Sequence, residues 1–322
     1  MATTDPGPRD HIVTRSLERK LGTLDEEVRI EEALDTAEAS GRLARHLMEE
    51  ARRELHDDTS SDEKADRVNG LLRQLGSGSG RDAEIALPAR LLQGIMGRSP
   101  MGAVVPLPPP PATPLSQSDL LVNGEGQPNV GSELRAELAT ADSVDLICAF
   151  IIWSGVRHLR DALAALTERG GRIRVITTTY MGATEKRAVD ELVSLGAAVR
   201  VAFDARTTKL HAKAWLLERA SGLSTAFVGS SNLSHTALFD GLEWNVRLSS
   251  TDAAHVIDRV RMTFESHWAS EHFEHYDPAV NGESLERALR EHDRRSLGKH
   301  QRSPLPISMC VLTHISSGCL KF

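Results

Sequence analysis

A histidine and a lysine lie two positions apart in the apolar stretch LHAKAWLL, residues 210–217. In a β-strand, alternate side chains point to opposite faces, so His211 and Lys213 would share one face. Two cationic groups side by side disfavour each other's charged form, and such a pair is unusual in a protein core. An imidazole next to an ammonium group therefore predicts a site for a phosphate anion.

Further polar residues follow this pair closely. The turn GSSN (229–232) comes directly after the apolar run TAFV. Such a turn is expected to offer backbone N–H groups, two hydroxyls and an amide to one anion. Glu243 comes next, in a stretch (242–249) whose alternation puts it on the same face as the other polar side chains of that stretch.

These residue types suit the cleavage of a phosphodiester. Histidine is an adequate nucleophile toward phosphorus near neutral pH. Lys213 and Asn232 can bind the non-bridging oxygens as charge builds up in the transition state, with Ser230 assisting. A carboxylate such as Glu243 on the far ring nitrogen of His211 would fix the tautomer and stabilise the imidazolium.

The spacing resembles the signature of the phospholipase D superfamily, HxKx4Dx6GSxN followed by a glutamate. It reads here as HAK (211–213), Glu218 in place of Asp, GSSN (229–232) and then Glu243. The resemblance covers roughly residues 119–275. Phrases such as DLICAFIIWSG and VGSSNLSHTAL are similar to the nuclease-type module that precedes the motor of some bacterial DEAD/DEAH-type helicases. The resemblance implies a metal-independent phosphodiesterase without a cofactor, with DNA as substrate and a covalent phosphohistidine on His211.

Two features depart from that signature. Ten residues rather than six separate Glu218 from Gly229, which suits a lengthened hairpin at 218–223. Only one HxK motif is present, whereas the superfamily uses two histidines, one as nucleophile and one as general acid. The resemblance to single-motif bacterial nucleases implies a homodimer, in which His211 of a second subunit protonates the leaving oxygen. The chain has no helicase motif, so a helicase would be a separate partner or a missing half.

Four further residues are candidates for substrate binding. Ser231 either binds phosphate or shapes the turn. Lys209 lies in a short basic stretch that forms either a phosphate path or the solvated entrance to a strand. Trp215, on the face of His211, either stacks on a base or packs in the core. Thr179 ends an expected strand, where α/β proteins often bind ligands, although β-propensity and helix capping also explain it.

The elements that must position these residues alternate between strands and helices from about residue 119. Apolar runs predict strands at 143–150, 172–178, 197–203, 210–217, 224–229 and 242–249. Amphipathic spacing predicts helices at 155–168, with Ser154 as N-cap, 185–195 and 252–268. This order predicts a phospholipase D-like α/β/α sandwich with a mixed, mostly parallel sheet.

Composition divides the chain into four parts. Residues 1–98 are predicted to form a charged helical region that serves an interaction, and 99–118 a proline-rich linker. Residues 119–275 form the expected phospholipase D-like domain. Residues 276–322 are expected to hold a C-terminal helix and a disordered tail.

Charge and composition limit the possible functions. The 322-residue chain has a net charge of −7, so any polyanion must be held by a local site rather than by the protein as a whole. Three cysteines without a CxxC pair indicate a reducing, cytoplasmic location. No signal sequence and no run of about 18 apolar residues is present, so no membrane partner is expected.

Two other functions stay open from the sequence. The first is a catalytically silent module of a helicase system, which binds nucleic acid or docks on a partner and in which the single motif never meets a second histidine. The second is a phospholipid hydrolase, which is disfavoured because no basic amphipathic helix for a membrane surface is evident.

Overall fold

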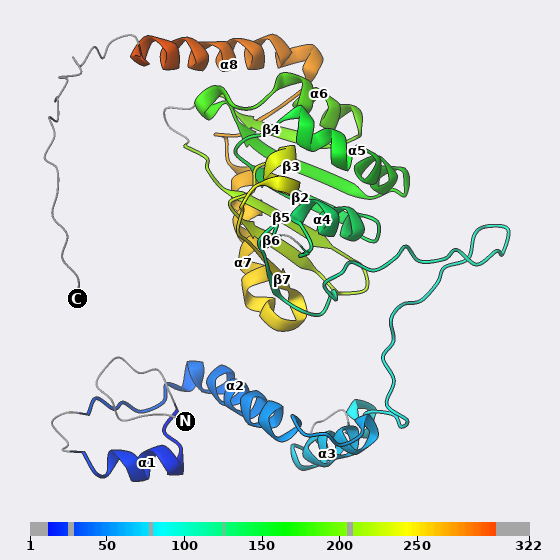
Figure 1. Cartoon of the computed structure of the whole chain (residues 1–322), viewed down its shortest axis with the longest axis vertical. Helices are drawn as coiled ribbons and strands as arrows, with labels where there is room; N and C mark the ends of the chain where they lie inside the picture. The colour runs from blue at the N-terminus through cyan, green and yellow to red at the C-terminus, as the bar shows by residue number, and fades with distance from the viewer. Residues whose placement is uncertain (1–11, 25–28, 77–79, 125, 205–208, 301–322) are drawn as a thin grey trace, which may run out of the picture. The chain divides into compact units, whose positions relative to one another are not determined.

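The computed structural model describes residues 12–24, 29–76, 80–124, 126–204 and 209–300. The chain divides into two units, Met1–Ile95 and Met96–Phe322 (Figure 1). This division lies close to the boundary predicted between the charged region and the proline-rich segment. The expected disordered tail lies outside the described residues. Within the described ranges, no helix combines the length and apolar character needed to cross a membrane.

The first unit is helical. Its helices are α1 (Arg15–Leu21), α2 (Thr36–Glu54) and α3 (Ser61–Gln74), followed by the short 3-10 turn η2 (Gly80–Ala83). Helix α3 begins with a capping box, because Ser60 accepts from the Glu63 backbone N–H while the Glu63 carboxylate accepts from the Ser60 N–H. Helix α2 buries none of its residues, as expected for a segment with so many charges.

The second unit contains one eight-stranded sheet. Its strands are β1 (Asp119–Leu121), β2 (Ser143–Cys148), β3 (Arg172–Thr178), β4 (Ala198–Ala202), β5 (Lys213–Glu218), β6 (Thr225–Gly229), β7 (Asn245–Ser249) and β8 (Glu274–His275). They are arranged in the order β1-β7-β6-β5-β2-β3-β4-β8. Among the described residues, all six predicted strands are present, and the short edge strands β1 and β8 are additional.

The sheet is mixed, as predicted, but the expectation of mostly parallel pairing is wrong. Only β2, β3 and β4 run parallel to one another, whereas all other neighbouring pairs are antiparallel. The reason is the type of connection. Helices link the three parallel strands, but the connections 219–224 and 230–244 between β5, β6 and β7 contain no crossover α-helix.

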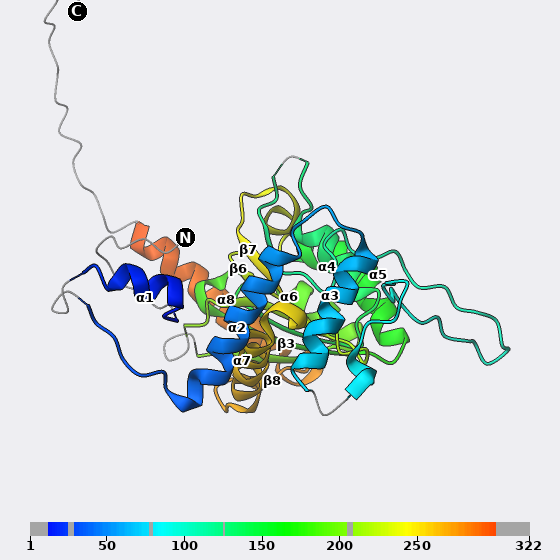
Figure 2. The ribbon, with the colours of Figure 1, turned by 90° about the horizontal axis from the view of Figure 1, so that it is seen from below.

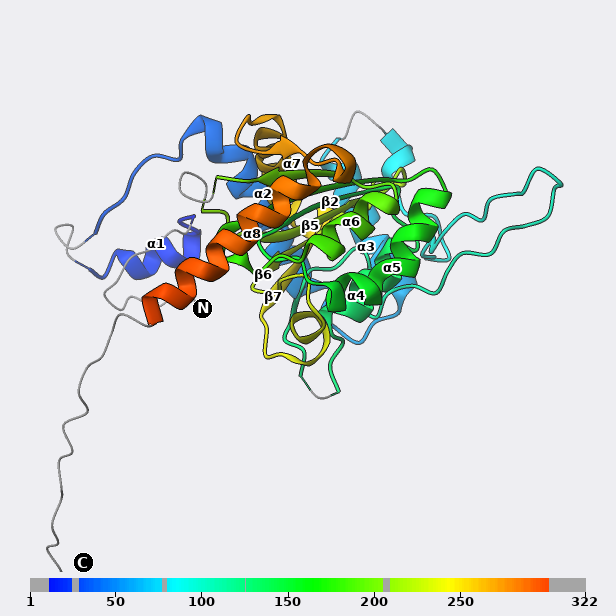
Figure 3. The same cartoon turned by 90° about the horizontal axis from the view of Figure 1, so that it is seen from above.

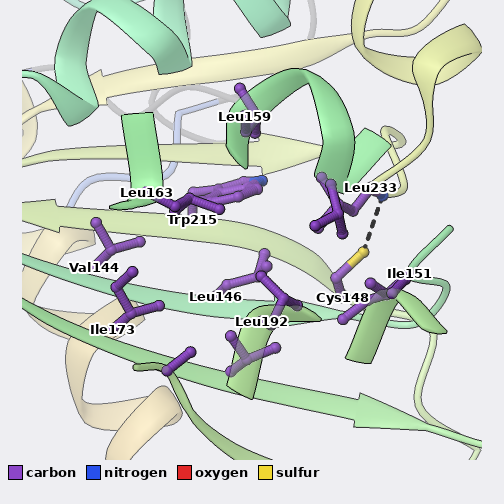
Figure 4. Close-up of a cluster of buried hydrophobic side chains, with 14 of the residues drawn as sticks. Val144, Leu146, Cys148, Ile151, Leu159, Leu163, Ile173, Leu192, Trp215 and Leu233 are labelled. Carbon is purple, nitrogen blue, oxygen red and sulfur yellow. Dashed lines mark hydrogen bonds between the residues drawn. The ribbon is translucent and has the colours of Figure 1, made fainter. Parts of the chain in front are cut away.

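Helices cover both faces of this sheet, so the α/β class is confirmed (Figure 3). The helices of the second unit are α4 (Val130–Leu138), α5 (Trp153–Glu168), α6 (Lys186–Ser194), α7 (Ser250–Ala269) and α8 (Pro278–His300). The main core lies between the sheet and α4, α5 and α6, where Trp215 meets the apolar side chains of α5 (Figure 4). On the opposite face, α7 packs through Ile257 and Phe264.

The proline-rich segment is only partly a free linker. Residues 96–111 form an irregular loop that turns back at a bridge between Arg98 and Val104 (Figure 2). The following residues are attached to the α/β unit, because the Glu133 carboxylate accepts from the backbone N–H groups of Ala112 and Thr113 at 3.0 and 3.1 Å. The last part of the segment therefore belongs structurally to the domain that it precedes.

A buried carboxylate joins the antiparallel half of the sheet to α4. Glu137 is fully buried, and its Oε1 accepts from Arg247 Nε at 2.6 Å while its Oε2 accepts from Arg219 Nη2 at 2.9 Å. Arg247 also donates to the carbonyl oxygens of Pro114 and Gln117, at 3.1 and 2.6 Å. One acidic side chain thus connects α4 to strand β7, to the end of β5 and, through Arg247, to the segment before β1.

We expect Glu137→Gln to destabilise the protein by about 3–5 kcal/mol, because it leaves two buried guanidinium groups without a countercharge. Urea unfolding followed by circular dichroism measures this loss. The matched control is Arg160→Gln, which breaks the exposed pair with Glu191 and should cost about 0–1 kcal/mol. Equal unfolding midpoints for the two variants would contradict the role assigned to Glu137.

Candidate active site

The predicted functional residues meet at one edge of the sheet. This edge contains the carboxyl end of β2, the beginnings of β5 and β7 and the end of β6, because β2 is antiparallel to β5 and β6 is antiparallel to β5 and β7. His211 lies just before β5, the GSSN turn follows β6, and Glu243 lies just before β7. Segments separated by more than 30 positions in the sequence are therefore adjacent here.

The structure brings His211 and Lys213 together. Lys213 Nζ lies 3.0 Å from Nδ1 and 3.3 Å from Nε2 of His211, and it donates to the His211 carbonyl oxygen at 2.8 Å. The imidazole is exposed, whereas Lys213 is buried. Burial lowers the pKa of Lys213, and the nearby negative charge of Glu243 acts in the opposite direction. A partly desolvated ammonium group in contact with an exposed imidazole can bind an anion at the point where the ring would attack it.

Ser230 and Glu243 form a second pair at the site. The Ser230 hydroxyl donates to the Glu243 carboxylate and accepts from the Trp244 backbone N–H at 3.1 Å. Within the described residues, no hydrogen bond joins Glu243 to His211, so the structure does not bring this carboxylate onto the ring as the sequence suggested. Glu243 instead fixes Ser230 and acts electrostatically on Lys213.

The GSSN turn is held from within. Ser231 is buried, and its hydroxyl donates to the Ala237 carbonyl at 3.0 Å and accepts from Asn245 Nδ2 at 2.7 Å. The backbone N–H groups of Ser230 and Ser231 are also used, by the Trp244 carbonyl and by Asn245 Oδ1. Ser231 therefore shapes the turn, which is one of its two predicted roles, and these two N–H groups are already hydrogen-bonded within the protein.

Asn232 differs from its neighbours in the turn. Its side-chain oxygen is buried and has no hydrogen-bond partner in the part of the chain that the structure describes. Buried polar atoms are normally satisfied, and exceptions often mark sites that complete their hydrogen bonds with a ligand. This oxygen can only accept a hydrogen bond, so binding of a phosphate oxygen would fall to the NH2 group of the Asn232 amide, and that role stays a prediction.

Sequence reasoning did not identify two residues that support this set. The Phe150 ring lies edge-on to His211, with 5.9 Å between ring centroids, and 6.0 Å from Lys213 Nζ. The buried Cys148 thiol accepts from the Leu233 backbone N–H at 3.3 Å and donates to the Phe150 carbonyl, and burial raises its pKa to about 11 (Figure 4). Both residues depend on the pairing of β2 with β5, which a pattern within one strand cannot reveal.

The other candidates for substrate binding are placed differently. Trp215 is only 5% exposed and packs in the main core, so the structure shows core packing, one of its two predicted roles, and offers no ring face to a base. Thr179 is fully buried, and its hydroxyl bonds to the carbonyl oxygens of Ala202 and Phe203. Its role is therefore structural. Lys209 is exposed two residues before His211, and its role in substrate binding stays a prediction.

Helix α5 begins at Trp153, so Ser154 is not its N-cap; the Ser154 hydroxyl accepts instead from the His235 backbone N–H at 3.2 Å. Among the described residues, no group of three or more histidine, cysteine, aspartate or glutamate side chains is arranged to hold a metal ion.

The comparisons with known proteins agree with the motif. Residues 134–268 match the family model described as "Cardiolipin synthase, PLD-like domain". The resemblance to the phospholipase D superfamily is thus confirmed, and these residues form a PLD-like domain. The match and the residues at the site together indicate a domain of the phosphodiesterase class. Among curated proteins, no sequence is significantly similar to the chain.

Several solved structures are similar to part of the chain. One is the phospholipase D family member Nuc from Salmonella typhimurium, with 15% identity and a TM-score of 0.36 over 50% of this chain and 97% of that one. Another is NucT from Helicobacter pylori, with 16% identity and a TM-score of 0.39 over 50% and 99%. A third is phosphatidylserine synthase from Haemophilus influenzae, with 12% identity and a TM-score of 0.37 over 57% and 47%.

Gly229→Ala should destabilise the protein by about 1–3 kcal/mol, because the turn approaches β7 too closely for a methyl group. A Cβ at Gly229 would lie 2.3 Å from the Trp244 carbonyl oxygen and 2.5 Å from Asn245 Oδ1. Thermal unfolding measures the effect. The control is Gly124→Ala, whose Cβ meets ordinary contacts at 3.7 Å and should change stability by less than about 0.5 kcal/mol. An unchanged melting temperature for Gly229→Ala would show that this close approach is not required.

Proposed function

We propose that the PLD-like domain is a metal-independent phosphodiesterase that cleaves DNA through a phosphohistidine on His211. The contact between Lys213 Nζ and both ring nitrogens of the exposed His211 is the observation that carries this proposal. It gives one accessible nucleophile and one buried cation at the same point. Nucleic acid as the substrate is also consistent with the nuclease-type names of two structural neighbours.

The first step is the attack of a neutral ring nitrogen of His211 on phosphorus. An N–P bond forms, and the bond from phosphorus to the leaving oxygen breaks with its electron pair on that oxygen. Lys213 and Asn232 stabilise the charge on the non-bridging oxygens, with Ser230 held beside them by Glu243. The negative charge of Glu243 also favours the protonated form of Lys213, which this role requires.

The leaving oxygen needs a proton, and we assign that role to His211 of a second copy of the chain. Within the described ranges, no second histidine side chain contacts His211. In the second step, a water oxygen attacks the phosphohistidine while the partner's His211 accepts a proton from that water. An O–P bond forms, and the N–P bond breaks with its electron pair on the ring nitrogen, which restores both histidines. The proton given in the first step is thus recovered in the second, and no metal or cofactor takes part in either.

An apolar surface beside the site supports this pairing. Leu120, Val246 and Val228 lie in register across β1, β7 and β6, and all three are exposed. Leu242 and Trp244, on either side of Glu243, are 89% and 67% exposed. A second copy covering this surface would bury apolar area and approach the same edge of the sheet that contains His211.

The nuclease proposal predicts cleavage of single- or double-stranded DNA in the presence of EDTA. We expect His211→Ala to lower the rate on the order of 10³-fold or more, because it removes the nucleophile. His255→Ala removes an exposed histidine of α7 and serves as the control, with an unchanged rate. Binding without cleavage by the folded wild type would instead favour the silent binding or docking module.

The shared site predicts a quantitative result for mixed dimers. If both histidines act in one site, only dimers of two wild-type subunits are active. An equal mixture of wild type and His211→Ala, allowed to exchange subunits, should then have about a quarter of the activity of the same total concentration of wild type. Independent sites would keep about half. Sizing by light scattering accompanies the assay, and an active protein that stays monomeric would contradict the assignment of the general acid.

A further inference from the structure

The strongest feature outside the catalytic set is a cationic and aromatic surface at the beginning of α5 and α6. It consists of Trp153, Arg157 and Arg187, which we call the Trp153 platform. Helices α5 and α6 lie side by side on one face of the sheet (Figure 3). Each follows a parallel strand, so both begin at the edge of the sheet where the catalytic residues meet.

The indole and one guanidinium of this platform are stacked. The guanidinium carbon of Arg187 lies 3.9 Å from the centre of the Trp153 ring. Trp153 is half-buried and packs against the main core, and its backbone N–H donates to the Glu185 carboxylate at 2.7 Å. Arg157 lies four residues after Trp153 on α5, so the two side chains share one face of that helix.

Both arginines carry charge that the described part of the chain does not neutralise. Arg157 and Arg187 are exposed, and neither forms an ion pair with a described carboxylate. Their neighbours behave differently, because Arg160 pairs with Glu191 and Lys186 pairs with Asp190. In a protein of net charge −7, two unpaired cations next to an aromatic ring indicate an anionic ligand that also has a flat face.

The platform is fixed to the catalytic site by short connections. Phe150, whose ring meets His211, is three residues before Trp153, so their Cα atoms are at most about 10 Å apart. Between them, the Ile152 backbone N–H donates at 2.9 Å to the carbonyl of Leu233, the residue after Asn232. Gly155 packs so tightly on Leu233 that a Cβ there would lie 2.4 Å from its carbonyl carbon. The platform is therefore next to the segments that carry Phe150 and Asn232.

We propose that the Trp153 platform binds a nucleotide of a single strand next to the scissile phosphate. This inference rests on the proposed function. The base stacks on the Arg187 guanidinium and the indole beneath it, and Arg157 binds a neighbouring backbone phosphate. A single strand fits better than a duplex, because bases paired within a duplex do not offer a free face for stacking. The platform would thus give the nuclease a preference for single-stranded substrate.

The test compares two substrates on each protein sample in EDTA: a single-stranded oligonucleotide and bis(p-nitrophenyl) phosphate, which is too small to reach the platform. We expect Arg187→Gln and Trp153→Ala to lower kcat/KM for the oligonucleotide about tenfold relative to kcat/KM for the small diester. Arg160→Gln, on the same helix as Trp153 but paired with Glu191, should leave this ratio unchanged. Arg187 is exposed, so its substitution tests the proposal even if Trp153→Ala fails to fold.

A strand without bases separates stacking from simple charge attraction. The effect of Trp153→Ala should disappear on an abasic oligonucleotide, and an equal loss on both strands would overturn the proposal. If Arg187→Gln leaves the ratio of kcat/KM for the oligonucleotide to kcat/KM for the small diester unchanged, the proposal is overturned, whatever the melting temperature. The platform would then be only a structural contact between α5 and α6. Failure of the wild type to hydrolyse the small diester would instead reject the proposed catalytic function, so the two failures are distinguishable.

Discussion

The arrangement of the site depends on one buried carboxylate. Glu137 on α4 binds Arg247 of β7 and Arg219 after β5, and the two guanidinium groups lie in the interior only because this acid balances them. Burying three charges costs solvation, which well-formed contacts offset only while all partners are present. These contacts fix β5 and β7 relative to α4, and β6 lies between them in the sheet. The antiparallel strands that supply Lys213, the GSSN turn and Glu243 therefore form a rigid group.

The second constraint is close backbone approach at the edge of the sheet. Gly229 packs against Trp244 and Asn245, and Leu233 bonds to both Phe150 and Cys148. The turn between β6 and β7 is thus held from two sides, and its side chains have little freedom. Lys213, Asn232 and Ser230 are positioned before a substrate arrives, which is what electrostatic stabilisation of a phosphoryl transition state requires. The His211 ring is exposed and contacts Lys213 and Phe150.

The sequence predicted the strands and the contact between His211 and Lys213 because both depend on local pattern. Alternation in 210–217 placed His211 and Lys213 on one face, and the two side chains are in contact although β5 begins only at Lys213. The same alternation also placed Trp215 on the face of His211. Further along β5, however, this face is covered by α5, so Trp215 is buried in the main core. The structural role of Ser231, the contact of Phe150 with His211 and the predominance of antiparallel pairs depend on strand order, which a single sequence does not encode in local pattern.

The central claim is that the phosphoryl group of the substrate is transferred first to His211 and then to water. The most direct test uses a phosphorothioate diester, in which sulfur replaces one non-bridging oxygen and makes the phosphorus chiral. The enzyme hydrolyses it in water enriched in oxygen-18, and the configuration of the product is determined. Two successive in-line displacements predict overall retention of configuration at phosphorus. Inversion would mean a single direct attack by water and would contradict the phosphohistidine, whatever the effect of substituting His211.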